Sequence, residues 1–538
     1  MVVVRGDRVQ TEEIFGTDFL KKVSGFSEII GYTVESDGTD IKIEFNPDRP
    51  DLFSFTTLDS AIRTFFLESE IPKQESVVGD VSFYITEEAL RLRPFVTSFV
   101  CRGGKIGARQ RDMIDFQERI HQTIGKDRYK VSIGIHDLER LKPPFRYISK
   151  PRDKVSFIPY DGNREMTAEE ILSLHEKGRQ YSNLLTSDNV PIIEDSLNQV
   201  LSMPPIVNGI ASRVSESTCN FFIDITGTDM KSAYGASLLL RHFFRSAGYI
   251  VEETRQTGGI PYSEILANDN RVIKVRISET KKILGQGSLK LDDIGISLRR
   301  MGYSLPPEFD AISIPVNVPG SRLDVMGEVD IIEDIGKALG YGSVPEFRPN
   351  LDLVGSLRDD TRIKDRIREV SVGLGFQEAM TFVVTASKFS AGLGRGSGAE
   401  IMNPKSQDFN VIRDRLRLNI LDLLRINKRR NLPQRIFEIG DVVIDFSQKT
   451  HLCYAITDSR AGFSSIKQYL NALLQRFGKV EPIFIPEAGA EFIPGRSGKI
   501  VINGKDFGII GEIHPETLQK FDLANPVALF EIDIDALK

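Results

Sequence analysis

The stretch from Gly320 to Tyr341, GSRLDVMGEVDIIEDIGKALGY, constrains the fold of this 538-residue chain more than any other. Apolar residues recur in it at helical spacing and predict one amphipathic helix: Val329, Ile332, Ile335 and Leu339. On that helix Asp330, Glu333 and Asp334 share one face, where each pair of like charges costs roughly a few tenths of a kcal/mol. The folded chain must contain or bind something that offsets this repulsion.

Two interpretations of the acidic helix stay open on the residues alone. Carboxylates are favourable near the N-terminus of a helix because the helix dipole is positive there. Alternatively, Asp324 and the three helical carboxylates bind a hard cation, because clustered oxygen ligands without His or Cys suit Mg²⁺ or Ca²⁺. Mg²⁺ takes one or two carboxylates directly, so some of the four would then act through water.

Composition excludes several classes of protein. The net charge of −6, from 69 Lys and Arg against 75 Asp and Glu, argues against a globally basic nucleic-acid binder but allows a local basic surface. The three cysteines lie far apart and no HExxH motif occurs, so neither a disulfide framework nor a zinc enzyme is expected. No signal peptide is recognisable, and no apolar run approaches about 18 residues. We expect a soluble, cytoplasmic protein without a membrane span.

The patterns along the chain predict an α+β protein with several domains. Short strands around Ile192–Ile193 and Asn220–Ile225, with a helix near 233–247, indicate a mixed α/β domain. From about residue 268, short helices and a small sheet form a compact module that ends in a linker at Pro345–Pro349. The last segment predicts helices packed on a largely antiparallel sheet, with a hairpin turn at Asn503–Gly504.

A second polar constellation comes from VLSMPPIVN (200–208) and FFIDITGTD (221–229). Two prolines fix a rigid turn beside Ser202 and Asn208, and Asp224 and Thr226 share one face of a strand. A well-made turn with a polar edge and a binding pocket explain these residues equally well. The chain contains no GxxxxGK[ST] and no GxSxG motif, so nucleotide hydrolysis by this chain alone is disfavoured.

Six motifs together resemble the β-subunit family of phenylalanyl-tRNA synthetases, of the archaeal and eukaryotic-cytosolic type. In chain order, from about residue 46 to 515, they are NPDRPDL, GIHDLERLKPPF, VLSMPPIVN, EVDIIEDIGKALGYGSVP, RIFEIGDVV and GEIHPETL. The resemblance implies an N-terminal domain (1–75), a mixed α/β editing domain (76–264) and a small, helix-rich, nucleic-acid-binding-like module (265–346). It also implies an inactive C-terminal domain with the antiparallel sheet of class II synthetases (352–538).

In that family the α subunit carries the aminoacylation site, so the resemblance implies an α₂β₂ tetramer that makes Phe-tRNA(Phe) from phenylalanine, ATP and tRNA. It also implies a Mg²⁺ ion shared with the α subunit. The ligands carried over from the family motif are Asp324, Asp330, Glu333 and Asp334. Such a metal at the subunit contact would offset the repulsion along the acidic helix.

The resemblance further implies that this chain removes tyrosine from mischarged tRNA(Phe). A synthetic pocket for phenylalanine rejects the added hydroxyl of tyrosine only weakly, by roughly 10² in the comparable valine and threonine case. The implied editing pocket consists of Ser202, Asn208, Asp224 and Thr226. We expect Asp224 to accept the tyrosine hydroxyl, and Ser202 and Thr226 to position the substrate. No general base is evident.

The C-terminal domain lacks the residues of an active class II core. Such cores hold an Arg that grips phosphate in an FRxE-like strand, but here Ile436 stands at that position and Arg435 is one residue out, on the opposite face. Two alternatives remain beside an editing subunit: a scaffold with a vestigial editing pocket, and a free-standing tRNA-binding regulator. An exposed apolar face would favour an obligate complex over the regulator.

Overall fold

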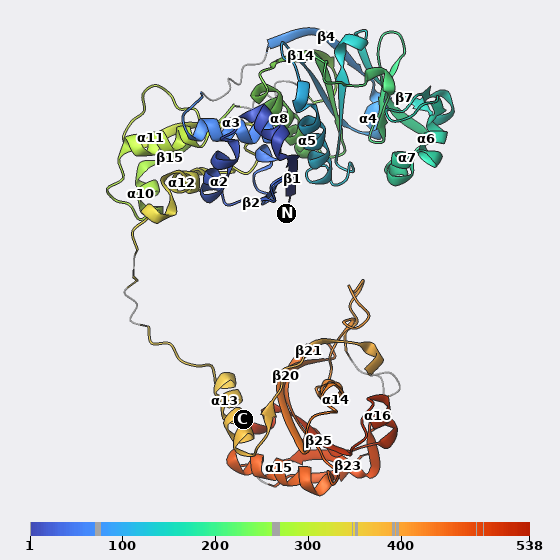
Figure 1. Cartoon of the computed structure of the whole chain (residues 1–538), viewed down its shortest axis with the longest axis vertical. Coiled ribbons are helices and arrows are strands. Elements are labelled where there is room, and N and C mark those ends of the chain that lie inside the picture. Colours follow the sequence, from blue (N-terminus) through green and yellow to red (C-terminus); the bar gives the residue numbers. More distant parts are fainter. Residues whose placement is uncertain are drawn as a thin grey trace. The chain divides into compact units, whose positions relative to one another are not determined.

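The structure is a computed structural model that describes residues 2–69, 77–260, 270–346, 348–349, 353–389, 393, 398–479, 481–487 and 489–538. The chain divides into two compact units, Met1–Arg348 and Pro349–Lys538 (Figure 1). This division falls at the end of the predicted linker. The finer boundaries predicted at residues 75 and 264 stay predictions.

The first unit begins with a small antiparallel sheet in the order β1-β3-β2, covered by helices. The elements are β1 (Val2–Asp7), α1 (Arg8–Phe15), α2 (Phe19–Ile30), β2 (Thr33–Ser36), β3 (Asp40–Phe45) and α3 (Phe55–Phe65). Alternate residues of β3 are buried, because one face of the strand packs on the aromatic side chains of the helices.

A large mixed sheet follows, in the order β12-β11-β10-β7-β4-β14-β5-β13-β6. Its strands are β4 (Val77–Ile85), β5 (Phe95–Arg102), β6 (Val131–Asp137), β7 (Phe145–Pro151), β10 (Asn189–Glu194), β11 (Val200–Met203), β12 (Val207–Asn208), β13 (Phe221–Gly227) and β14 (Ile250–Thr257). Only the pairs β4–β14 and β4–β7 are parallel among the described pairs of this sheet. The predicted mixed α/β architecture is therefore confirmed.

Helices cover this sheet on both faces. The long helices α5 (Gln110–Gln122) and α8 (Met230–Ser246) pack on the half that contains β5, β13 and β6. The short helix α4 (Glu87–Leu92) packs on β7 and β10 over a separate apolar cluster. A capping box of Thr167 and Glu170 opens α6 (Ala168–Leu174), and the short helix α7 (Glu176–Tyr181) follows.

The last part of the first unit is a module of short helices on a two-stranded ribbon. Its elements are β15 (Asn270–Arg276), α10 (Ile277–Ile283), α11 (Leu291–Arg300), β16 (Ser313–Pro319) and the acidic helix α12 (Glu328–Leu339). One continuous core joins this module to the N-terminal helices and to α8, through buried residues such as Phe26, Leu239 and Ile335.

The second unit is a sheet in the order β17-β20-β21-β25-β24-β23-β22, antiparallel except for β17–β20. The strands are β17 (Gln377–Glu378), β20 (Gln434–Ile444), β21 (Ser447–Thr457), β22 (Ile483–Pro486), β23 (Phe492–Ile502), β24 (Lys505–Ile513) and β25 (Val527–Asp533). A small hairpin joins β18 (Val384–Thr385) to β19 (Val411–Ile412). The predicted turn at Asn503–Gly504 connects β23 and β24, and both residues adopt positive φ.

Two pairs of helices enclose that sheet. Helices α13 (Asp359–Gly373) and α15 (Phe463–Arg476) pack on the face that carries Phe437 and Tyr454. Helices α14 (Arg417–Ile426) and α16 (Pro515–Lys520) pack on the face that carries Ile436 and Leu529. The α+β fold class predicted from the sequence, including the antiparallel C-terminal sheet, is confirmed.

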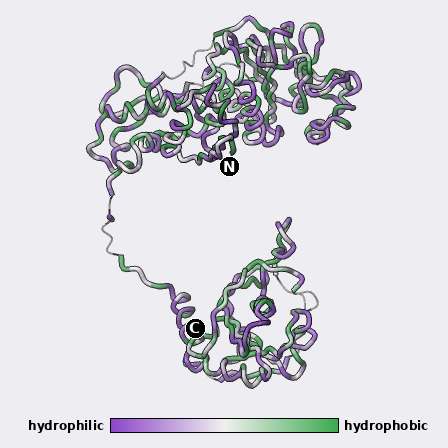
Figure 2. The backbone as a smooth tube through the Cα atoms, viewed as in Figure 1, coloured by the Kyte–Doolittle hydropathy of each residue, from purple (hydrophilic) through white to green (hydrophobic). Residues whose placement is uncertain are grey.

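Hydrophobic and hydrophilic residues alternate along the chain in both units (Figure 2). No helix in the described part of the chain combines the length and apolarity that a membrane crossing requires.

Candidate functional site

A cavity lies at the β6 edge of the large sheet, between α5 and the turn that joins β11 to β12. Three of the four predicted pocket residues, Ser202, Asn208 and Asp224, line this cavity. Its other polar lining residues are Gln117, Glu118, Arg128, Ser132, Tyr160 and Lys177.

Asp224 is held by a hydrogen-bonded chain that runs through His136 to Ser212. Nε2 of His136 lies 2.7 Å from Oδ2 of Asp224, and Nδ1 lies 2.7 Å from Oγ of Ser212. Because a carboxylate only accepts, Nε2–H donates to Asp224, and in the neutral ring Nδ1 accepts the hydroxyl proton of Ser212. The side chains of all three are buried. The second oxygen of Asp224, Oδ1, has no hydrogen-bond partner among the described residues.

The register of the sheet makes room for this contact. Asp224 of β13 stands directly opposite Gly134 of β6. A Cβ atom on residue 134 would approach both Oδ2 of Asp224 and Nε2 of His136 more closely than real Cβ contacts allow. Glycine at this position is therefore required for the carboxylate and the imidazole to meet.

The other three predicted pocket residues differ in their surroundings. Ser202 stands opposite Asn208 in the β11–β12 pair, and its buried Oγ has no hydrogen-bond partner among the described residues. Thr226 is fully buried beside Arg93, whose Nε donates to Oγ1 at 3.3 Å, and it does not line the cavity. The structure thus brings Ser202, Asn208 and Asp224 together and gives Thr226 a neighbouring position behind Asp224.

Charged groups fix the opposite wall of the cavity. Arg128 donates to the carbonyl oxygen of Ile206 at 2.9 Å and to Oε1 of Glu118 at 2.7 Å, which ties α5 to the proline turn. Burial raises the pKa of Glu118, but the imidazole of His121, whose Nδ1 lies 3.4 Å from Oε1, and the charges of Arg128 and Lys177 lower it to about 2. Glu118 therefore stays ionised at neutral pH and is not a ready proton donor.

Sequence reasoning missed His136 and Ser212 as parts of this site. His136 lies in GIHDLERLKPPF, a motif used only for the resemblance, and it is 88 residues away from Asp224. The signal that could have found it is the isolated His in the apolar strand VSIGIHD, because a buried imidazole needs a partner for each ring nitrogen. No spacing rule identifies Ser212.

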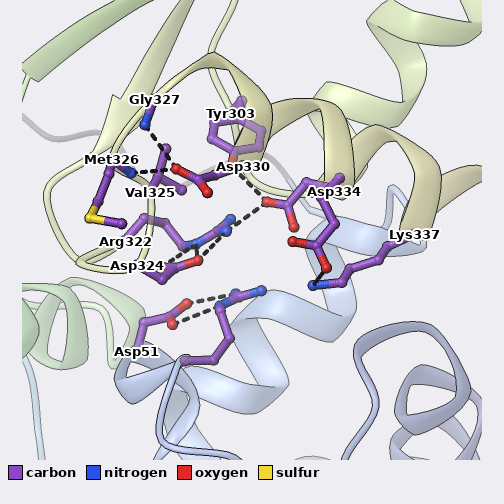
Figure 3. A network of polar contacts seen from close by, with 12 residues as sticks. Asp51, Tyr303, Arg322, Asp324, Val325, Met326, Gly327, Asp330, Asp334 and Lys337 are labelled. Atoms are coloured by element: carbon purple, nitrogen blue, oxygen red, sulfur yellow. Dashed lines mark hydrogen bonds and ion pairs between the residues drawn. The ribbon is translucent and has the colours of Figure 1, made fainter. Parts of the chain in front are cut away.

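The acidic helix finds its compensating charges within the chain (Figure 3). Arg322 lies between two of the carboxylates: it donates to Asp324 from Nε at 2.9 Å and from Nη2 at 2.7 Å, and Nη2 lies 2.6 Å from Oδ2 of Asp334. Asp334 also accepts the hydroxyl proton of Tyr303 at 2.6 Å. Burial acts to raise the pKa of Asp324, but Arg322 outweighs it and lowers that pKa.

The remaining two carboxylates are compensated separately. Oδ2 of Asp330 accepts from the backbone N–H groups of Met326 and Gly327, at 2.7 and 2.8 Å, as a cap of the helix N-terminus. Glu333 pairs with Lys337 one turn later at 3.0 Å. One buried arginine, a helix cap and a surface ion pair therefore offset the repulsion between the carboxylates of the acidic helix.

This arrangement does not fit a metal ion held by the chain alone. Asp324, Asp330, Glu333 and Asp334 each direct at least one oxygen to a donor of the protein. No group of three or more His, Cys, Asp or Glu side chains among the described residues could hold a metal. The Mg²⁺ site with these four ligands stays a prediction that the geometry does not support.

The second unit carries exposed apolar side chains near β17 and β18. The exposed fractions are 89% for Met380, 75% for Phe382 and 88% for Met402. The ring centroids of Phe382 and Phe409 are 5.7 Å apart. Monomeric proteins rarely expose a cluster of large apolar residues that has no partner.

Comparisons with known proteins now identify the family. A family model described as the phenylalanyl tRNA synthetase beta chain CLM domain matches residues 344–534, and a model of the tRNA synthetase B5 domain matches residues 273–341. A phenylalanine–tRNA ligase beta subunit of Thermoplasma volcanium is 43% identical over 542 residues, which cover 100% of this chain and 99% of the relative. The chain belongs to the phenylalanine–tRNA ligase β-subunit family.

Further relatives agree with this assignment. The phenylalanine–tRNA ligase beta subunit of Thermoplasma acidophilum is 41% identical, over 100% of this chain and 98% of the relative. An N-terminal fragment of the phenylalanyl-tRNA synthetase β subunit from Pyrococcus horikoshii has a similar structure, with a TM-score of 0.56 and 28% sequence identity. It covers 63% of this chain and 100% of its own length. As a member of this family, the chain is a subunit of an aminoacyl-tRNA ligase.

Proposed function

We propose that this β subunit, together with an α subunit, attaches phenylalanine to tRNA(Phe) at the expense of ATP, and that it hydrolyses Tyr-tRNA(Phe) in the cavity beside Asp224. The observation that carries the editing assignment is the carboxylate of Asp224. It lines the cavity, His136 fixes one of its oxygens, and the other oxygen has no partner in the described residues. The alternatives of a vestigial scaffold and a free-standing regulator are not favoured.

Selection of tyrosine follows from the cost of leaving buried polar groups unpaired. The tyrosine hydroxyl donates to Oδ1 of Asp224, whereas phenylalanine would leave this buried carboxylate oxygen desolvated and without a donor. An unsatisfied buried polar group costs about 1–3 kcal/mol, and more if it is charged. The pocket therefore prefers the mischarged amino acid, which is the inverse of the preference of a synthetic site.

The hydrolytic step adds water to the ester carbonyl and releases tyrosine and free tRNA(Phe). In our proposal Asp224 holds the substrate ring, while Ser202 and Asn208 contact the polar groups around the ester. Thr226 acts through its packing beside Asp224. We assign no general base, and in our proposal the cavity positions the ester and the attacking water.

The exposed apolar cluster of the second unit supports the partner assignment. Burial of Met380, Phe382 and Met402 against an α subunit would remove a large apolar surface from water. We propose an α₂β₂ tetramer in the cytoplasm, with ATP, phenylalanine and tRNA(Phe) as its substrates. Mg²⁺ bound by the acidic helix remains a prediction for the assembled enzyme only.

The C-terminal unit has a supporting role in this proposal. Ile436 belongs to the apolar cluster under α14, whereas Arg435 lies over the ring of Tyr469 in α15, 5.8 Å from its centroid. The two side chains thus lie on opposite faces, as the strand pattern predicted. A guanidinium on the α15 face does not replace the missing phosphate-binding Arg, which supports an inactive domain.

Deacylation by the complex reconstituted with its α subunit tests the proposal. Wild-type enzyme should hydrolyse Tyr-tRNA(Phe) at least tenfold faster than Phe-tRNA(Phe), and Asp224→Ala should remove this difference. Aminoacylation with phenylalanine should be unchanged in the variant, which controls for assembly. If the wild-type complex charges tRNA but leaves both esters intact, the chain does not edit.

A further inference from the structure

A cavity lies where three distant segments of the first unit meet. Helices α2 and α3 form one side, α8 forms another, and the ends of α11 and β16 close it. It shares no lining residue with the cavity around Asp224. The proposed editing function therefore gives this cavity no role.

Basic side chains dominate the polar lining of this cavity. They are Arg49, Arg245, Arg300, Arg322 and His242, against the single lining carboxylate of Asp51. Arg49 and Asp51 form a buried pair at 2.7 Å. Arg322 is held from behind by Asp324 and Asp334, as Figure 3 shows, and neither of these carboxylates lines the cavity.

Two of the guanidinium groups keep donors that no described residue satisfies. Nη1 of Arg322 is buried and has no hydrogen-bond partner. Nε of Arg300 is likewise buried without a partner, and Arg300 makes no ion pair with any described residue. Its guanidinium lies over the ring of Phe65, 5.7 Å from the centroid. Buried donors in proteins are normally satisfied, so both groups call for an acceptor in the cavity.

The rest of the lining is apolar. Phe26, Leu238 and Met301 are almost completely buried and face this space from three different helices or their ends. A ligand that accepts hydrogen bonds from the guanidinium groups and also packs against the apolar side chains therefore combines an anionic group with an apolar body.

We propose that this cavity is a binding site for a small organic anion, whose phosphate or carboxylate group accepts hydrogen bonds from Arg300 and Arg322 and whose apolar body packs against Phe26, Leu238 and Met301. Arginine suits this task because its planar donors match the oxygens of either anion. A ligand here contacts all three segments at once, so its binding stabilises their packing.

Calorimetric titration of the full-length chain with phenyl phosphate tests the proposal. We expect saturable binding that is at least tenfold tighter than binding of phenol, which lacks the anion, or of inorganic phosphate, which lacks the apolar body. Benzoate distinguishes recognition of a phosphate from recognition of a carboxylate. Absence of saturable binding for both phenyl phosphate and benzoate would overturn the proposal.

Arg300→Gln should weaken the binding of phenyl phosphate at least tenfold. The matched control is Arg299→Gln, which removes an exposed charge from the same turn of α11 and should leave binding unchanged. Equal affinity of Arg300→Gln and wild type contradicts the site. In the wild-type chain, phenyl phosphate should also slow hydrogen exchange at the end of α11 and in α8, a readout that does not depend on any variant folding.

Discussion

At the scale of single residues, the most informative side chain is His136. It is fully buried, and its ring stacks on Phe222. Nε2 forms a hydrogen bond with Asp224, and Nδ1 forms one with Ser212. This chain of contacts leaves Asp224 one orientation in the cavity wall. In our proposal, His136 is a positioning residue that acts through Asp224.

His136→Ala should lower kcat/KM for deacylation of Tyr-tRNA(Phe) by about 10- to 100-fold, because a hydrogen bond to a charged group contributes roughly 1.5–3 kcal/mol. The selectivity for tyrosine over phenylalanine should fall with it, and aminoacylation should not change. Ser212→Ala removes only the outer contact and should cause a smaller loss. A variant that hydrolyses both esters more slowly by the same factor would indicate a general defect and contradict the positioning role.

A second buried charge sets a pH dependence in the C-terminal unit. Burial alone would raise the pKa of Glu531, but the charge of Arg417 and a hydrogen bond with His451 lower it to about 2. Against an ordinary value of 4.5, this contributes about 3 kcal/mol to folding at neutral pH. Because the folded-state pKa is depressed, the contribution is complete above about pH 4.5 and disappears as the pH falls toward 2.

Glu531→Gln should therefore have a free energy of unfolding about 3 kcal/mol below that of wild type at pH 7, and the difference should be small at pH 2. Urea unfolding followed by circular dichroism across this range measures the difference. Glu516→Gln, at an exposed position of α16, should follow wild type at every pH. A loss of stability in Glu531→Gln that is the same at pH 7 and pH 2 would contradict the assignment.

At the scale of elements, the acidic helix α12 shows what local patterns predict and what they do not. Spacing predicted the helix itself but only part of its buried face: Ile332 and Ile335 are buried as predicted, whereas Val329 is 63% exposed. The partner of its charges was not, because Arg322 precedes the helix and returns to Asp334 only in the folded module. For the same reason, the hairpin turn at Asn503 was predictable from neighbouring residues, whereas the contact of His136 with Asp224 depends on strand register.

Asp330→Ala should lower the unfolding free energy of the first unit by about 1 kcal/mol, because it removes the cap of α12. Thermal unfolding of the isolated chain measures this effect, and millimolar Mg²⁺ should change the Tm of neither protein. Glu333→Gln, which breaks only an i,i+4 surface pair, is the control and should cost less. A Mg²⁺-dependent rise in Tm that Asp330→Ala abolishes would instead favour the metal site.

At the scale of the whole molecule, the two units differ in how their hydrophobic cores are built. The first unit joins its N-terminal helices, large sheet and acidic module through one core, which gives its two cavities fixed walls. The second unit is covered by helices on both faces of its sheet but exposes apolar side chains near β18. In our proposal the first unit binds the ester that is hydrolysed, and the exposed side chains near β18 bind a partner subunit.

Phe382→Ser should weaken binding of the α subunit about 10- to 100-fold, because burial of a phenylalanine side chain contributes roughly 1.5–3 kcal/mol. Co-purification and sedimentation of the complex measure the loss. Phe446→Ser removes a still more exposed phenylalanine at the β20–β21 turn and serves as the control. If both variants assemble as wild type does, the cluster around Phe382 is not the contact surface.

The central claim is that the cavity beside Asp224 recognises tyrosine by its hydroxyl, and binding of two stable analogues tests it most directly. These are adenosines that carry tyrosine or phenylalanine through an amide at the 3′ position, titrated into the complex by calorimetry. We predict that wild type binds the tyrosyl analogue at least tenfold more tightly and that Asp224→Ala binds both equally. Equal affinity in wild type, or a preference that survives in Asp224→Ala, would contradict the account.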